Sequence, residues 1–191
     1  MTKNNKKGFT IIEVVLVLAI AGLIFLMVFI ALPALQRSQR NTRRRQDMAR
    51  VLSAVNDYQA NNNGNVPKSG EELKNFVSRY LDESCTADTG TWYANTSNCG
   101  DQFKDPDGTG YNIMSRGTSG DYVDQDSGTD YYKVDMGNTS GANKGFNHQI
   151  LLVHGYVCSD IEGKVKKAAG NNIVSVLYTL EGGSIYCGDN E

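Results

Sequence analysis

An uncharged, apolar segment dominates the start of the chain. From Val14 to Leu35 no residue is charged. About 20 consecutive apolar residues are enough to cross the hydrocarbon core of a bilayer as a helix, so this segment predicts a membrane-length helix. It is longer than the apolar core of a secretory signal, which holds roughly 7–15 residues, and no small-residue cleavage site follows it.

The pattern then changes to that of an amphipathic helix. Apolar residues recur at spacings of three and four and mark one helix face: Met48, Val51, Leu52, Val55 and Tyr58. The asparagine-rich segment 61–65, followed by Pro67, is typical of a helix end. We expect a helix over residues 9–60, about 75–80 Å long at about 1.5 Å per residue. Residues 9–35 form its transmembrane or polymerisation part, residues 36–60 its amphipathic continuation, and residues 61–191 a globular head.

The first part of the head predicts a second helix. Ser69, with Glu72 three residues later, has the spacing of a capping box. An apolar stripe follows with helical spacing and continues to Leu81, so we expect the helix to end near residues 82–83. Residues 84–148 are rich in Gly, Asn, Asp, Ser and Thr, which predicts loops with short strands at 111–114 and 130–134.

The last third of the chain predicts a sheet. β-rich runs occupy residues 149–157, 173–180 and 184–187, and Glu181-Gly182-Gly183 predicts a tight hairpin turn between the last two. We read residues 163–169 as a short helical segment between strands. The fold class is therefore α+β, with one long N-terminal helix packed on a small antiparallel sheet.

Glu13 is the exception to the apolar character of the N-terminal helix. It stands four residues after Phe9, and the charge-free segment begins directly after it. Because a charge in hydrocarbon is energetically expensive, we expect this carboxylate to have a function. Three lysines and Gly8 precede the segment: Lys3, Lys6 and Lys7.

The sequence Lys-Lys-Gly-Phe-Thr-Ile-Ile-Glu over residues 6–13, followed by an apolar helix, resembles the class III signal of type IV prepilins. The resemblance covers residues 6–35 and is loose beyond them. It implies that a prepilin peptidase removes residues 1–8 as a leader by cutting after Gly8. It also implies that the same enzyme N-methylates the new N-terminal residue, Phe9, and that the head has the type IV pilin fold.

The resemblance also assigns assembly roles. Glu13 is implied to pair with the N-terminal amine of a neighbouring subunit as a filament grows, and each buried charge then offsets the desolvation of the other. Pro33 lies slightly later than the proline of many pilins. The segment from Gly22 to Pro33 is implied to lose helical hydrogen bonds on assembly.

Charge is distributed unevenly along the chain. Residues 1–50 carry nine Lys/Arg and two Asp/Glu (+7), whereas residues 51–191 carry ten and nineteen (−9). Direct nucleic-acid binding is not expected of an acidic head, because the phosphate backbone requires a basic surface. The arginines between Arg37 and Arg50 would, by the positive-inside rule alone, place the head in the cytoplasm. The leader and the four cysteines instead favour export of the head, and we give them more weight than the positive-inside rule. We expect a single pass through the inner or cytoplasmic membrane before assembly, and a surface-exposed filament afterwards.

The four cysteines all lie in the head. None has C-x-x-C spacing, which disfavours zinc and thioredoxin-like sites, and an even number in an exported domain favours disulfides. Three disulfide pairings of the four cysteines are possible. We favour Cys85–Cys99 and Cys158–Cys187 because each encloses a local unit, and each would stabilise the head by about 2–4 kcal/mol.

Residues 105–109, Asp-Pro-Asp-Gly-Thr, begin like an EF-hand calcium loop. The EF-hand interpretation fails because the twelfth position holds Arg116 rather than Glu. A looser structural Ca²⁺ site on Asp105 and Asp107 stays open by resemblance to pseudopilins, and an ordinary Asp-Pro-Asp-Gly turn is the favoured alternative. Three further acidic residues are candidate ligands for that calcium site: Asp121, Asp124 and Asp126.

Residues typical of an enzyme are missing. The sequence has no nucleophile elbow, phosphate loop or zinc motif, and His148 and His154 lack an acid at suitable spacing. We predict a structural subunit, a major pilin, of a homopolymeric helical filament. It would be built by the pilus assembly machinery and serve adhesion or twitching motility. A minor pilin or type II secretion pseudopilin, acting in DNA uptake or secretion, is the alternative. A membrane-anchored binding domain that never polymerises is the third hypothesis.

Overall fold

The computed structural model describes residues 8–85, 87–89, 93–100, 103–116, 123–125, 130–134, 148–170 and 172–191. These fall into two compact units, Met1–Arg40 and Asn41–Glu191. The secondary structure confirms the α+β class, with a long N-terminal helix and a sheet that is mostly antiparallel.

Helix α1 runs from Ile11 to Asn61 and contains Pro33, close to the bounds that the sequence predicts. The part in the first unit is long and apolar enough to cross a membrane. Its large apolar side chains are open to solvent in the isolated chain, from 43% exposed at Leu32 to 85% at Ile11. A continuous apolar surface of this kind requires lipid or partner helices, because monomeric soluble proteins rarely expose large apolar patches.

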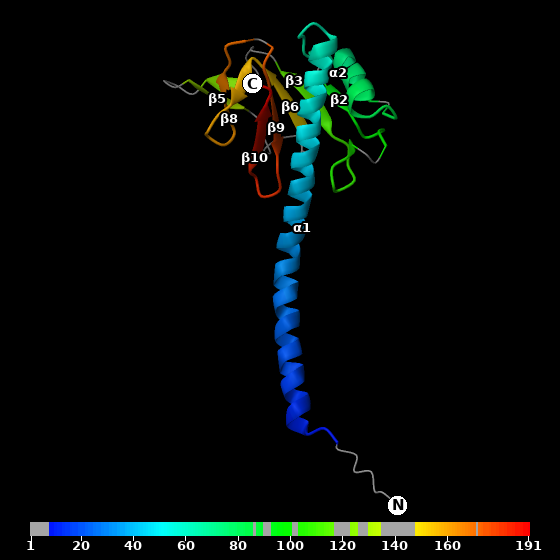
Figure 1. The fold of residues 1–191 in the computed structure, drawn as a ribbon, viewed down its shortest axis with the longest axis vertical. Helices are drawn as coiled ribbons and strands as arrows, with labels where there is room; N and C mark the ends of the chain where they lie inside the picture. The colour runs from blue at the N-terminus through cyan, green and yellow to red at the C-terminus, as the bar shows by residue number, and fades with distance from the viewer. Residues whose placement is uncertain are drawn as a thin grey trace, which may run out of the picture. The chain divides into compact units, whose positions relative to one another are not determined.

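The second unit forms around the part of α1 from Asn41 to Asn61. The predicted apolar face is buried there, and Met48, Val51 and Val55 have no exposed surface. They belong to one core cluster with side chains of α2 and of the six-stranded sheet. Figure 1 shows this part of α1 lying between α2 and strands β6 and β9.

Helix α2 confirms the predicted capping box. It spans Gly70–Phe76, the Ser69 side chain accepts from the Glu72 backbone N–H, and the Glu72 side chain accepts from the Ser69 N–H. A π-helical turn, Val77–Leu81, continues it, so the helical segment ends where the apolar stripe ends. Leu73, Phe76, Val77 and Leu81 all join the core around α1.

The larger sheet has six strands in the order β1-β2-β3-β6-β9-β10. Its β9–β10 hairpin turns through Gly182 and Gly183, both with positive φ, as Glu181-Gly182-Gly183 predicts. One feature differs from the expected antiparallel sheet, because β3 and β6 pair in parallel. The strands are β1 (Asp88–Thr89), β2 (Tyr93–Asn95), β3 (Asn112–Arg116), β6 (Gln149–His154), β9 (Val174–Thr179) and β10 (Ile185–Asp189).

A second sheet of four strands has the order β4-β5-β8-β7. It corrects two predictions. The run 149–157 is not one strand, because Gly155 takes a positive φ of 76° and sends β7 into this second sheet. Residues 163–169 are not helical. Lys-Val-Lys alternation suits a strand, and it buries Val165 completely. The strands are β4 (Val123–Gln125), β5 (Tyr131–Val134), β7 (Tyr156–Cys158) and β8 (Lys164–Lys167).

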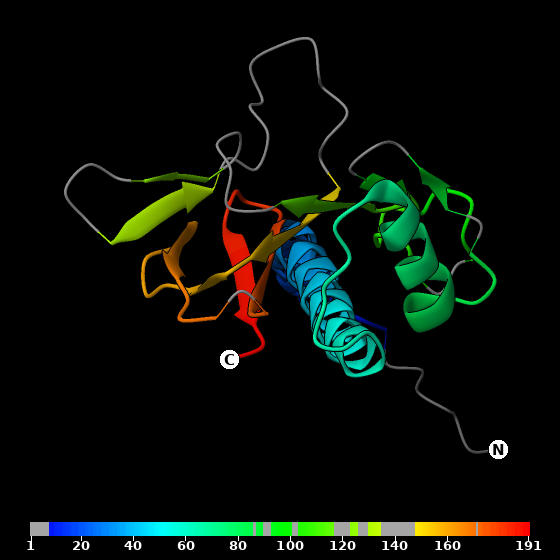
Figure 2. The ribbon, with the colours of Figure 1, turned by 90° about the horizontal axis from the view of Figure 1, so that it is seen from above.

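Strand β6 lies in the middle of a three-layer head, and all six of its residues are buried. Because successive side chains of a strand point to opposite faces, Ile150 and Leu152 join the cluster around α1, whereas Leu151 and Val153 join a second cluster with residues of β5 and β8. Seen from above, α1 lies on one side of β6 and β9, and the smaller sheet lies away from it (Figure 2). A strand buried on both faces explains the continuous apolar run at residues 150–153.

Two disulfides cross-link this head. Cys85 is bonded to Cys99, and Cys158 to Cys187, which is the pairing favoured from the sequence. The first closes the segment that follows α2. The second links β7 of the smaller sheet to β10 of the larger one, so it holds the two sheets together.

His154, at the end of β6, is a buried histidine without a charged partner. It is 5% exposed, its Nε2 is hydrogen-bonded to the Ser115 hydroxyl, and its Nδ1 has no hydrogen-bond partner among the described residues. Burial, with a smaller effect of Lys68, lowers its pKa to about 4. The folded head therefore holds this imidazole neutral at pH values where an unfolded chain would protonate it.

We expect the head to lose about 1.5 kcal/mol of stability between pH 6.5 and pH 5 through His154. A histidine with a lowered folded pKa favours unfolding as the pH falls below its unfolded pKa of about 6.5, and each pKa unit corresponds to about 1.4 kcal/mol. The measurement is thermal unfolding of the full chain in detergent, followed by tyrosine near-UV dichroism. The variant His154→Gln should show a flatter pH dependence in this window. An equal pH dependence in both proteins would contradict the assignment.

Candidate assembly segment and buried ion-pair site

The residues around the predicted processing junction lie at the start of α1. Gly8 and Phe9 are exposed and precede the helix. The Thr10 N–H and the Thr10 hydroxyl each donate to Glu13 Oε2 at 2.8 Å, and the Glu13 N–H faces the Thr10 hydroxyl at 3.4 Å. This is the geometry of a capping box, with Thr10 as the N-cap residue. Glu13 thus satisfies helix-end donors, a role that the sequence analysis missed although the Thr-x-x-Glu spacing signals it.

The capping bonds use one oxygen of Glu13. Both donors of Thr10 approach Oε2, and among the described residues nothing donates to Oε1. The carboxylate is exposed, and it stands in the first turn, where the helix dipole favours negative charge. The arrangement can therefore accept a further cation without losing the cap.

Gly22 and Pro33 lie inside the continuous helix. A Cβ at Gly22 would have no heavy atom within 4 Å, so nothing in the isolated chain requires glycine there. Pro33 has no N–H to donate, which leaves the carbonyl of Phe29 without its helical donor. Both residues weaken the helix locally, and their loss of hydrogen bonds on assembly stays a prediction.

A second site joins α1 to two loops of the head. Arg44 is 5% exposed, and its guanidinium donates to both oxygens of Asp105, at 2.6 Å from Nε and 2.7 Å from Nη2. Its Nη1 donates to Glu181 Oε1 at 2.8 Å. Asp105 precedes β3, and Glu181 lies in the β9–β10 turn. One guanidinium therefore holds both segments against the helix, in the bidentate geometry that makes such pairs strong.

Asp105 receives further donors. The Tyr178 hydroxyl donates to its Oδ2 at 2.8 Å, and His148 Nδ1 lies 3.5 Å from the same oxygen. Burial would raise the pKa of Asp105, but the hydrogen bonds from Arg44, His148 and Tyr178 outweigh it and hold the pKa well below its usual range. Asp105 in turn raises the pKa of His148. The site therefore keeps Asp105 ionised and favours a protonated His148.

The candidate calcium residues lie in this network. Asp105, Asp107 and His148 bring their ligand atoms within 4.8 Å of one another, and His148 Nε2 is 3.1 Å from Asp107 Oδ2. The loop is also a tight turn, because the Gly108 N–H donates to the Asp105 carbonyl at 2.8 Å. Calcium at Asp105 and Asp107 stays a prediction, and the ion would have to compete with Arg44 for Asp105. The other candidate ligands do not bear on this geometry, since Asp121 and Asp126 lie outside the described residues and the side chain of Asp124 is not described.

Arg44 is the residue that sequence reasoning missed. The sequence analysis counts it only among the arginines between Arg37 and Arg50, yet it lies four residues before Met48 on the buried face, so the periodic stripe of α1 already included its position. Asn41 extends the same face, since its side chain accepts from the Glu181 N–H at 3.0 Å and donates to the Glu181 carbonyl at 3.1 Å. The helical spacing of Arg44 from Met48 indicated a buried position, whereas its charge suggested an exposed one.

We expect Arg44→Met to destabilise the head by about 3–5 kcal/mol, because Asp105 would be left buried with its main partner removed. Adding Asp105→Asn should restore at least about 1 kcal/mol of that loss, since neighbouring partners couple. Thermal unfolding of the full chain in detergent measures both. The adjacent, exposed Arg45→Met is the matched control and should change little. Equal effects of Arg44→Met and Arg45→Met would contradict the buried ion pair.

The comparisons with known proteins bear on the N-terminal segment. Residues 3–29 match the family model of the prokaryotic N-terminal methylation motif. No curated protein and no solved structure matches the chain. The motif implies processing by a prepilin peptidase and assembly into pili, fits membrane anchoring before assembly, and suggests a structural rather than an enzymatic protein. With this motif at the start of a long apolar helix, the chain carries the class III signal of type IV pilins.

Proposed function

We propose that the chain is a structural subunit, a major pilin, of a type IV pilus that serves adhesion or twitching motility. The observation that carries the proposal is the exposed apolar part of α1 with Glu13 in its first turn. A plain membrane anchor needs the apolar surface but not the carboxylate. A subunit that moves from a bilayer into a filament needs both features. Partner helices would replace lipid around the apolar surface, and a cation of a neighbouring subunit would pair with the carboxylate.

The Glu13 carboxylate supports a specific form of this proposal. When the leader is removed after Gly8, Phe9 gains a free amine. In a filament, that amine of one subunit would meet Glu13 Oε1 of a neighbour, while Oε2 stays bonded to Thr10. A buried charge without a partner is strongly unfavourable, so only one stagger of the helices would be stable. The pair would therefore set the register in which apolar surfaces pack.

Two other assignments use the same signal. A minor pilin or a type II secretion pseudopilin would share the processing and the helix but be present in few copies or in a short structure. A membrane-anchored binding domain would keep the helix in lipid permanently. Abundance in filaments sheared from cells separates a major pilin from a minor pilin or pseudopilin. The state of the N-terminus, processed or uncut, separates these from the membrane-anchored binding domain.

We expect the subunit recovered from sheared surface filaments to begin at N-methylated Phe9 and to lack residues 1–8. Intact-mass spectrometry and N-terminal peptide analysis measure this. An abundant processed chain supports a major pilin, and a trace amount beside another abundant subunit supports a minor pilin. Uncut protein confined to the membrane, with none in the sheared fraction, would contradict the proposal.

We expect Glu13→Gln to abolish or strongly reduce filament assembly although it keeps the helix cap. Glutamine serves in a capping box as glutamate does, so this variant removes the charge while leaving α1 capped. Glu13→Ala, which removes both, should fail as well. Filament yield by shearing and electron microscopy measures assembly, and the amount of processed protein in the membrane controls for expression.

The glutamine variant separates the two roles of Glu13. Normal filaments from Glu13→Gln together with none from Glu13→Ala would show that capping alone is required, and would refute the charge-pairing model. Normal filaments from both would favour a chain that does not depend on this residue for assembly.

A further inference from the structure

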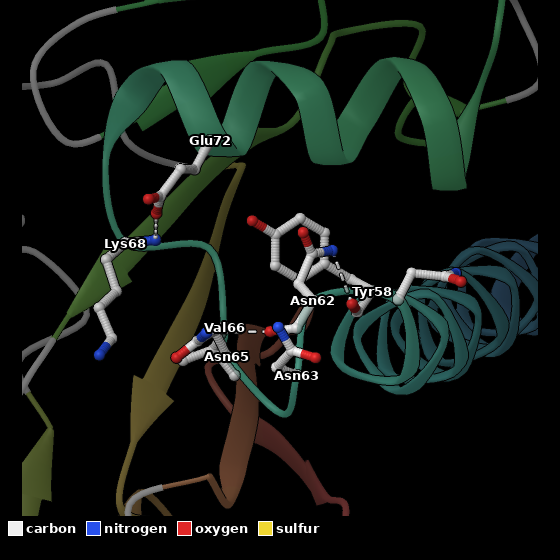
Figure 3. A pocket seen from close by; sticks show the side chains of 8 residues that line it. Tyr58, Asn62, Asn63, Asn65, Val66, Lys68 and Glu72 are labelled. Atoms are coloured by element: carbon white, nitrogen blue, oxygen red, sulfur yellow. Dashed lines mark hydrogen bonds between the residues drawn. The ribbon is translucent and has the colours of Figure 1, made fainter.

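The loop between α1 and α2 encloses a hollow in the head, apart from the ion-pair site and the assembly segment. Its volume is about 420 Å³, within the roughly 300–1,000 Å³ of small-ligand sites. Figure 3 shows side chains of the α1 end, the loop and the start of α2 surrounding it. It is lined by Tyr58, Asn61, Asn62, Asn63, Asn65, Val66, Lys68 and Glu72.

The asparagines of this hollow present acceptors. The amide nitrogens of Asn61, Asn62 and Asn65 each donate to a main-chain carbonyl, at 2.9, 2.8 and 2.9 Å. Because the nitrogen of each amide is engaged in this way, its carbonyl oxygen is left to accept from another group. Among the described residues, nothing donates to these three oxygens. The end of α1 and the loop therefore offer three neutral acceptors whose amide nitrogens are held by the main chain.

Glu72 adds a charged acceptor. Its Oε2 accepts from the Lys68 and Ser69 N–H groups at 2.6 and 3.2 Å, and no described residue donates to Oε1. The Tyr58 hydroxyl and the Lys68 ammonium are the complementary donors, and neither has a hydrogen-bond partner among the described residues. The lining thus combines several unpaired acceptors, two donors and the ring of Tyr58, with Val66 as its only aliphatic residue.

The frame around the hollow is held by ring packing and by hydrogen bonds of the loop. The Tyr58 ring packs edge-on against Phe76 and Tyr80, with centroids 5.9 and 5.5 Å away. Asn63 and Gly64 take positive φ values of 55° and 76°, and the Gln59 amide donates to the Asn172 carbonyl beside Gly64. A ligand would therefore meet a site that is already formed, which lowers the ordering cost of binding.

We propose that this hollow binds a neutral, hydroxyl-rich ligand, a monosaccharide or the end unit of an oligosaccharide. Sugar hydroxyls both donate and accept, so a sugar in this hollow can donate to acceptors of its lining and accept from its donors. An apolar peptide finds too little apolar surface here. A bound anion would lie against the Glu72 carboxylate. Such binding does not depend on filament assembly, so it can be tested on the unassembled chain.

The test is saturation-transfer NMR on the full chain in a zwitterionic detergent that has no sugar headgroup. Glucose, galactose, mannose and N-acetylglucosamine are the probes, each followed by titration. Glu72→Gln keeps the capping box but replaces the free acceptor by an amide donor. The matched control is Glu71→Gln, the same change at the exposed neighbour in the first turn of α2. Asn65→Ala, with exposed Asn75→Ala as its control, tests the amide carbonyls.

At least one of these sugars should bind wild type, with affinity reduced at least about tenfold in Glu72→Gln and in Asn65→Ala and unchanged in both controls. Near-UV dichroism shows whether each variant keeps the native fold. The proposal is overturned if no sugar binds wild type, or if folded Glu72→Gln and Asn65→Ala both bind like wild type. A response to calcium chloride without any response to sugars would also overturn it, because the acceptors would then form a cation site.

Discussion

The apolar part of α1 cannot be left in water, and the biology of the chain depends on this constraint. Every large apolar side chain from Phe9 to Leu35 is exposed in the isolated molecule, so the segment must lie in a bilayer or among other helices. The signal at residues 3–29 is consistent with both environments in succession. A filament core built from the same surface needs no new interaction to replace lipid. What it does need is a way to select one packing among many, because apolar helices slide past one another with little change in free energy.

In the second unit, the same helix forms part of the packed core of the head. Its buried face carries Met48, Val51 and Val55 against the sheet, and the same face includes Arg44, which binds two loops at once. An ion pair of this kind contributes little net stability compared with apolar packing. Its effect is positional, since it holds Asp105 and Glu181, which lie far apart in sequence, against the same helix. The head therefore combines a packed core with a buried arginine that orders the two loops of Asp105 and Glu181.

The sequence was informative where pattern and chemistry agreed. The capping box at Ser69 and Glu72, the Gly182-Gly183 turn and the face of α1 follow from local rules, and the structure has them all. It was misleading where tertiary context decides. Residues 164–167 form a strand because β5 and β7 pair on either side of them, and the short Lys-Val-Lys alternation does not by itself specify that pairing. Arg44 was obscured by its charge, although its spacing placed it on the buried face. The parallel pairing of β3 with β6 depends on a long connection whose path the local pattern does not specify.

Glu13 shows how one residue can meet two requirements that seem opposed. A carboxylate in an apolar helix is unfavourable, yet at the first turn it satisfies the N–H and hydroxyl of Thr10 and interacts favourably with the helix dipole. The isolated chain therefore tolerates the charge before any partner arrives. On burial in a filament, the cap alone would no longer compensate for lost hydration, because a hydrogen bond from a hydroxyl does not neutralise a charge. A cation at the free oxygen would. Under the proposed pairing, the residue would be acceptable in the monomer and favourable only in one assembled arrangement, which is the property that a register-setting group requires.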